Sequence, residues 1–322
     1  MRDEMSKWPW LLPINSRRLL FYERRILKDA DLILSVSAPL VEDFKQIGGG
    51  IDKVIEITNG YDYEEVHDVS FQPVYTMAFI GHFYNSITPD KWFGAFSELV
   101  AEGALPSDSR ILIIGNTSPL AVPENIRQNV FQIRQVDHDE AIRKSLETDT
   151  LVVVHPKGRK GVYTGKLFDY LATNKPILAI CDPDDLIADL LKETRAGFTA
   201  DETDNEQVKR MLLRCYSIWK NKEVLPRDWD KIRQYSRKNQ VGRLLEYLAG
   251  QEALLPYITP SFRRRLHAAE KMLTEDGTMF TGLFEANPYS HEAVRQYRKM
   301  LNVAAAGDIE LLCRRAQWWW KK

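Results

Sequence analysis

Short runs of apolar residues alternate with amphipathic stretches between about residues 31 and 200. The runs are continuous, which is typical of strands buried on both faces of a parallel sheet. They are LILSV (32–36), VIEIT (54–58), TMAFIG (76–81), RILIIG (110–115), VFQIR (130–134), LVVVH (151–155) and ILAIC (177–181). Helices are predicted near 16–29, 38–47, 89–102, 138–148, 165–174, 184–195 and 204–220. The pattern predicts an α/β fold with a doubly wound parallel sheet, which binds ligands at the carboxyl ends of its strands.

The pattern becomes purely helical after about residue 228. One continuous helix is predicted over residues 228–249. Pro256 and Pro260 then interrupt the chain, because proline lacks a backbone N–H and stops a helix. Further helices are predicted near 261–274, 289–305 and 308–319.

The stretch TGKLFDYLATNKP at residues 164–176 carries the clearest chemical signal. It follows an apolar run and the Gly-rich basic loop GRKGVY (158–163), so a strand, a basic loop and a helix N-terminus meet there. The first N–H groups of a helix lack an intrahelical partner and the helix dipole adds positive charge, which suits this corner to a phosphate. Gly165 lets the phosphate approach the backbone, and Lys166 supplies a full charge. Asp169 is placed to accept hydrogen bonds from ribose hydroxyls.

A Walker-type P-loop is excluded at this corner because two required residues are missing. That motif needs a Gly, four residues, Gly-Lys and then Ser or Thr. Lys160 stands where the first Gly should be, and Leu167 stands where the magnesium-binding hydroxyl should be. An ordinary strand–helix crossover with solvated charges remains an alternative.

Composition excludes several classes of protein. The net charge of −1 over 322 residues gives no general attraction to nucleic acid, and no apolar run reaches the ~18–20 residues that span a bilayer. The N-terminus MRDEMSKWPW is too polar and acidic for a signal peptide. Cys181, Cys215 and Cys313 form no CxxC pair, and the six histidines show no metal-ligand spacing. We therefore expect a cytoplasmic protein with neither a disulfide framework nor a protein-bound metal.

Four stretches, taken in order, resemble the GT-B-fold retaining glycosyltransferases of family 4 and their relatives. YERRILKDADLILSVSAPLVEDF (22–44) is similar to the end of that family's N-terminal domain, and KVIEITNGYD (53–62) is similar to its interdomain crossing. TMAFIGHF (76–83) resembles the first strand and glycine loop of its nucleotide domain. GVYTGKLFDYLATNKPILAI (161–180) resembles the subgroup that reads "tgKlfEYLa". The resemblance covers roughly residues 1–245 and implies sugar transfer from a nucleotide-sugar donor.

The chain departs from this family in two ways. Val162 and Asp169 occupy the positions where the family often has two glutamates, and Asp keeps the charge with a shorter reach. Only about 50 residues precede the crossing at Asn59, fewer than a typical domain has, so most of the N-terminal domain is expected to be missing. The resemblance divides the chain into a partial N-terminal domain (1–58), a Rossmann-like nucleotide-sugar-binding domain (59–249) and a helical C-terminal extension (250–322).

The resemblance also assigns residues to the donor site. Gly81 would approach the sugar diphosphate and His82 would line the pocket, with a simple tight turn as the alternative. The loop at Arg134 and Gln135 would contact the base, with a solvated loop as the alternative. His155 either faces the pocket mouth or is satisfied by a partner inside the fold. The residues expected to bind the donor are Gly81, Phe83, Arg134, Gln135, His155, Thr164, Gly165, Lys166 and Asp169, and those expected to act in catalysis are Lys166, Asp169 and His82.

Retaining GT-B transfer implies neither a protein nucleophile nor a required metal, so we expect no cofactor beyond the donor. The acceptor would be a glycan or a lipid-linked molecule. A non-catalytic half-protein that binds a nucleotide-sugar and needs a partner domain is the alternative. A sugar-nucleotide epimerase is disfavoured because the chain offers few acid/base groups, and a nicotinamide dehydrogenase is disfavoured because GxGxxG follows no strand.

The C-terminal extension falls outside the resemblance. Residues 250–322 hold eleven Lys and Arg against eight Asp and Glu, a net charge of +3, and end in Trp318-Trp319-Trp320-Lys321-Lys322. Tryptophans beside lysines suit a bilayer interface, whereas packing of these rings on the α/β core is the alternative. Residues 1–58 are expected to lean on the nucleotide domain, with Arg2, Asp3, Trp8 and Trp10 near an incomplete acceptor face that invites self-association or cover by the extension.

Overall fold

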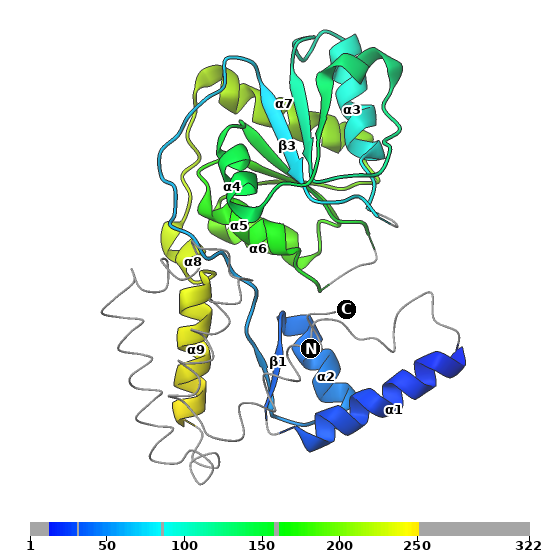
Figure 1. The fold of residues 1–322 in the computed structure, drawn as a ribbon, viewed down its shortest axis with the longest axis vertical. Coiled ribbons are helices and arrows are strands. Elements are labelled where there is room, and N and C mark those ends of the chain that lie inside the picture. Colours follow the sequence, from blue (N-terminus) through cyan, green and yellow to red (C-terminus); the bar gives the residue numbers. More distant parts are fainter. Residues whose placement is uncertain (1–12, 31, 85–86, 158–160, 251–322) are drawn as a thin grey trace. The chain divides into compact units, whose positions relative to one another are not determined.

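The computed structural model describes residues 13–30, 32–84, 87–157 and 161–250 (Figure 1). The chain divides into two compact units, residues 1–240 and 241–322, and the boundary falls within the last described helix. The first unit contains all the described strands. The predictions made for Arg2, Asp3, Trp8, Trp10 and Cys313, for the helices near 261–274, 289–305 and 308–319, and for the terminal tryptophans lie outside the described residues.

Six parallel strands form the main sheet, in the order β5-β4-β3-β6-β7-β8 (Figure 1). They are β3 (Thr76–Ile80), β4 (Arg110–Ile114), β5 (Val130–Ile133), β6 (Thr150–Val154), β7 (Ile177–Ile180) and β8 (Gly197–Ala200). Every residue of β6 and β7 is buried, which explains their continuous apolar runs. The strand order reverses between β3 and β6, which are neighbours although β4 and β5 separate them in sequence. The predicted doubly wound parallel sheet is confirmed.

Helices cover both faces of this sheet and build two cores. One face is covered by α3 (Asp90–Ala101) and α7 (Asn205–Asn221), and the other by α5 (Gly165–Ala172) and α6 (Leu186–Thr194). The connections are completed by α4 (His138–Leu146) and the 3-10 helix η2 (Glu124–Asn129). Cys215 lies in the first core and Cys181 in the second. Burial raises the pKa of each thiol to about 12, so neither behaves as a reactive cysteine.

The N-terminal segment of the first unit forms a small layer of its own. It consists of α1 (Pro13–Asp29), β1 (Ile33–Ser35), α2 (Ala38–Ile47) and β2 (Val54–Glu56). The two strands pair in parallel, with Ile33 opposite Val54, and form a separate two-stranded sheet. Its core contains Leu27, Leu40 and Phe44. Val162, which follows β6 in the sequence, packs against this core. Val162, at one of the family's glutamate positions, thus has a packing role.

The single helix predicted over 228–249 is wrong, because the chain forms α8 (Trp229–Arg233) and α9 (Arg237–Gly250). The residues between them pair with the crossing segment instead of continuing a helix. The Tyr61 N–H donates to the carbonyl of Tyr235 at 3.3 Å, and the Arg237 N–H donates to the carbonyl of Tyr61 at 2.8 Å. A Cβ on Gly60 would lie 2.3 Å from the Tyr235 oxygen, so this close approach requires glycine.

Strand β8 was not predicted from the sequence. Its residues GFTA form no apolar run, and Gly197 sits so close to β7 that a Cβ there would lie 1.9 Å from the carbonyl oxygen of Ile177. A glycine in a strand often marks such a close backbone approach. Among the described helices, none combines the length and apolarity that crossing a bilayer requires.

Candidate functional site

The candidate site lies where the strand order reverses, between the carboxyl ends of β3 and β6. Open α/β sheets bind ligands in the crevice at such a point. Gly81 follows β3 directly, and its N–H donates to the carbonyl of Ile114 at the end of β4, at 2.7 Å. The backbone of Gly81 has a φ of 126° and that of Gly115, after β4, has a φ of 92°, values that favour glycine. The two glycines therefore place no side chain of their own at this edge of the sheet.

Lys166, in the first turn of α5, reaches into the space that Gly81 leaves open. A Cβ on Gly81 would lie 2.7 Å from the Nζ atom of Lys166. Helix α5 is held to β3 by Tyr170, whose hydroxyl accepts a hydrogen bond from the N–H of Ile80 at 2.9 Å. The fold thus brings the motif "TGK" close to the glycine loop, although the two segments are far apart in the sequence.

The ammonium group of Lys166 is buried without an acidic partner among the residues that the structure describes. Its Nζ lies 3.8 Å from the centre of the Phe79 ring, within the range of a cation–π contact. Burial lowers the pKa of Lys166 to about 7. A buried cation with no counterion is costly unless a ligand brings the negative charge. A negatively charged ligand beside Nζ would stabilise the charged form of Lys166.

At the N-terminus of α5, the Thr164 hydroxyl has no partner among the described residues. The N-cap residue Thr164 makes no capping hydrogen bond with its side chain. Its Oγ1 atom is buried and has no hydrogen-bond partner within the described part of the chain. Gly165 follows with open space around its Cα, since a Cβ there would meet no atom within 4 Å. Helix N–H groups, a hydroxyl and a lysine are the kinds of donor that bind phosphate in proteins.

Asp169 lies one turn further along α5, in a cluster that the sequence did not predict. The potential ligand atoms of Asp62, His138 and Asp169 lie within 4.8 Å of one another. Burial raises the pKa of Asp169 to about 6, and the nearby His138 opposes this rise. The His138 Nε2 atom lies 3.5 Å from Asp62 Oδ1, and Arg237 Nη1 lies 2.9 Å from Asp62 Oδ2. The carboxylate at the family's ribose position thus faces an imidazole and a second carboxylate.

Charge in this cluster is set mainly by the contact between His138 and Asp62. This contact lowers the pKa of Asp62 and raises that of His138. Two carboxylates and one imidazole also have the chemistry of a divalent-cation site. Arg237 already neutralises Asp62 from the other side. The three residues come from the crossing segment, the start of α4 and the middle of α5, so no sequence spacing reveals them.

His155 is buried inside the fold and lies beside a carboxylate there. Its Nε2 atom lies 3.3 Å from Asp185 Oδ2, and both side chains are almost fully buried. The other carboxylate oxygen of Asp185 accepts hydrogen bonds from the N–H of Leu186 at 2.8 Å and from the N–H of Gly161 at 3.0 Å. The hydroxyl of Ser37 donates to the carbonyl of Gly161. His155 thus contacts the carboxylate that binds the end of the basic loop, and its predicted contact with the donor stays a prediction.

The other predicted donor residues fall into two groups. The ring of Phe83 is buried and stacks on Phe79, with ring centres 4.1 Å apart and planes inclined by 12°. The ring of Phe83 thus supports the Phe79 ring that Lys166 contacts, and donor binding by Phe83 stays a prediction. His82, Arg134 and Gln135 are exposed at the ends of their strands, where a ligand can reach them.

Solved structures similar to this chain are GT-B glycosyltransferases. Sucrose-phosphate synthase from Thermosynechococcus elongatus matches with a TM-score of 0.55 and 14% identity, over 76% of this chain and 65% of that chain. A glycosyltransferase from Rickettsia africae ESF-5 matches with a TM-score of 0.55 and 14% identity, over 74% and 67% of the two chains. Anabaena HepE, in complex with UDP and glucose, matches with a TM-score of 0.52 and 13% identity, over 78% and 71%. No protein-family model and no curated protein matches the sequence.

These likenesses show the fold of the chain, which is that of GT-B glycosyltransferases. The chain spans about two thirds of the length of the first two structures.

Proposed function

We propose that this protein is a glycosyltransferase that transfers a sugar, with retention of anomeric configuration, from a nucleotide-sugar donor to a glycan or a lipid-linked acceptor. The observation that carries the proposal is Lys166, a buried cation without an acidic partner among the described residues, at the N-terminus of α5 and against Gly81. A nucleoside diphosphate supplies the missing negative charge. The likeness of the fold to sugar transferases, and the presence of UDP in HepE, support a nucleotide-sugar as the ligand.

Each part of the site has a role in this reaction. Lys166 and the N–H groups of α5 bind the diphosphate and stabilise the charge that develops on it as the sugar departs, a contribution that is often the largest in catalysis. Asp169 accepts hydrogen bonds from ribose hydroxyls. His82 is exposed next to Gly81 and lines the sugar side of the pocket. The proposal requires neither a protein nucleophile nor a metal ion.

A second function is favoured by the small N-terminal layer. Strands β1 and β2 form a sheet of two strands, which offers little surface for an acceptor. A protein that binds a nucleotide-sugar and depends on a partner domain for transfer would have this construction.

A thermal-shift panel of nucleoside diphosphates and their sugars tests the proposal. Ligand at about 100 times its Kd should add about 2.7 kcal/mol to the free energy of unfolding. Lys166→Met should abolish this shift, whereas Lys192→Met removes an exposed lysine from α6 and serves as the matched control. If no nucleotide stabilises the protein, the proposal fails. Release of nucleoside diphosphate with a panel of acceptors then separates the two functions, because the binding protein alone would give a shift without turnover.

A further inference from the structure

The exposed face of helix α1 combines large apolar side chains with basic ones. Phe21, Tyr22 and Ile26 are 62%, 51% and 46% exposed. The other large apolar side chains with such exposure in the described chain are Tyr84, Phe131, Val224 and Val241, which are far apart in the sequence. Three such residues within six positions of one helix therefore form a patch, unlike the scattered exposed residues that need no explanation.

Positive charge surrounds this patch. Arg17, Arg18, Arg24, Arg25 and Lys28 are all exposed on α1. Asp29 is the one exposed acidic residue of the helix among those whose side chains are described, and it lies 3.6 Å from Arg25. Glu23 is buried on the opposite side of the helix, together with Leu27. The charge of the exposed face is therefore strongly positive.

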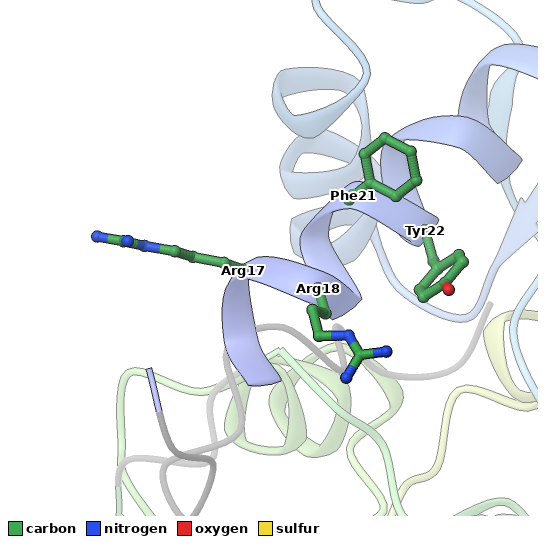
Figure 2. Close-up of a pocket in the computed structure, with 4 residues that line it drawn as sticks. All are labelled: Arg17, Arg18, Phe21 and Tyr22. Carbon is green, nitrogen blue, oxygen red and sulfur yellow. The ribbon is translucent and has the colours of Figure 1, made fainter. Parts of the chain in front are cut away.

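Four of these side chains line a pocket of about 250 Å³ (Figure 2). The four side chains project from one stretch of the helix; they belong to Arg17, Arg18, Phe21 and Tyr22. The rings of Phe21 and Tyr22 meet edge to face, with their centres 5.7 Å apart. Guanidinium groups match phosphate with two parallel hydrogen bonds, and aromatic rings favour the boundary between headgroups and acyl chains.

We propose that this basic-aromatic face of α1 (Arg17, Arg18, Phe21, Tyr22, Arg25 and Ile26) docks on a bilayer that contains anionic lipid. A helix with this composition lies in the plane of the interface, with its apolar side chains below the headgroups and its basic groups among them. The inference is independent of sugar transfer, since it concerns neither Lys166 nor Asp169.

Charge and side-chain type favour lipid over other occupants of this face. A nucleic acid would pair with the arginines but offers Ile26 no apolar layer. The chain's own residues 250–322 carry a net charge of +3, and a second copy would bring two positive faces together. An anionic bilayer offers negative charge and an apolar layer within a few ångströms of each other.

Co-sedimentation of the full chain with vesicles tests this proposal. Vesicles of phosphatidylcholine and phosphatidylglycerol, mixed at about 2:1, should bind the protein, and vesicles of phosphatidylcholine alone should bind it at least tenfold more weakly. Arg17→Glu/Arg18→Glu should lower binding to the anionic vesicles at least tenfold, since each basic group near such a surface contributes about 1 kcal/mol. Phe21→Ser/Tyr22→Ser should lower it severalfold, and the loss should persist in high salt because it removes the apolar contact.

The matched control reverses the charge of two exposed arginines outside α1, Arg127→Glu/Arg143→Glu, and should bind vesicles like the wild type. Unfolding curves establish that all variants are folded. The proposal is overturned if anionic vesicles do not bind the wild type, if the control loses binding equally, or if binding survives both α1 variants and so belongs to another part of the chain. It is also overturned if Phe21→Ser/Tyr22→Ser instead turns a dimer into a monomer, since a second copy would then cover this face.

Discussion

Binding of a nucleotide-sugar should weaken as the pH rises above 7, because Lys166 must gain a proton when the donor binds. Burial holds the pKa of Lys166 at about 7 in the free protein, so the amine is largely neutral between pH 8 and pH 9. A diphosphate next to Nζ favours the ammonium form and raises this pKa in the complex. Binding therefore takes up a proton throughout this range of pH.

The size of the effect follows from the pKa. One unit of pH above the pKa costs about 1.4 kcal/mol when the amine must be protonated. Lys166 is charged in half of the molecules at pH 7 and in about one in a hundred at pH 9. Binding should therefore weaken about 50-fold between these two pH values. At pH 8 about 0.9 proton should be taken up per ligand. A nucleotide-sugar is the proper probe, because it lacks the terminal phosphate monoester whose second ionisation lies near pH 6.

Calorimetric titrations at pH 7, 8 and 9, each in two buffers with different heats of ionisation, measure both the affinity and the proton uptake. Replacing Lys166 by Met keeps a side chain of similar length without the amine. The Lys166→Met variant should bind the nucleotide-sugar about 100-fold more weakly at pH 7, and it should take up no proton there. Lys192→Met should behave like the wild type. A wild-type affinity that stays constant between pH 7 and pH 9, or a pH dependence that survives in Lys166→Met, would refute the reasoning.

Three further predictions concern single side chains. Gly81→Ala should lower the free energy of unfolding, measured by urea titration, by about 1–3 kcal/mol, because Gly81 has a positive φ and a Cβ there would contact Lys166. Gly94→Ala is the control, since Gly94 lies in a helix and no atom lies within 4 Å of the new Cβ. It should raise the free energy of unfolding by up to about 1 kcal/mol. Arg227→Met should cost about 3 kcal/mol by urea denaturation, because the buried guanidinium donates to three carbonyl oxygens, and a loss below 1 kcal/mol would contradict this role. Burial raises the pKa of Asp169 to about 6, so its contribution to the free energy of unfolding falls as the pH rises from about 4 to 6. At pH 7 the Asp169→Asn variant should therefore unfold at a higher temperature than the wild type. It should nevertheless bind ribonucleotides more weakly. Equal affinities would show that this carboxylate does not contact the ligand.

The sequence predicted most of the sheet because burial on both faces leaves a local trace. The other five strands of the main sheet each appear as an apolar run, whereas β8 begins at Gly197, which lets β7 approach closely. The break between α8 and α9 was missed for a different reason. It depends on pairing of residues 235–237 with Tyr61, more than 170 positions away, and nothing in the local pattern of residues 228–249 reports that contact.

Some residues of the candidate site could likewise be predicted from the local sequence, and others could not. Gly81, Gly165 and Lys166 were predicted because each stands at the end of a strand or at the start of a helix, where the local sequence indicates its place. The environment of Asp169 was not, since Asp62 and His138 reach it from other segments. The sequence also could not predict that the side chain of His155 is buried. An imidazole at the end of a strand suggests a ligand contact, but His155 contacts Asp185 inside the fold.

The two described cysteines give the protein a pair of internal reporters. Cys215 is fully buried in the core on one face of the main sheet and Cys181 in the core on the other, and both thiols are inert in the folded state. Each can react with a labelling reagent only when its own core opens. Equal labelling rates, followed residue by residue by mass spectrometry, would mean that both faces open in one cooperative event. A faster rate at one cysteine would identify the face that opens while the rest of the sheet stays closed.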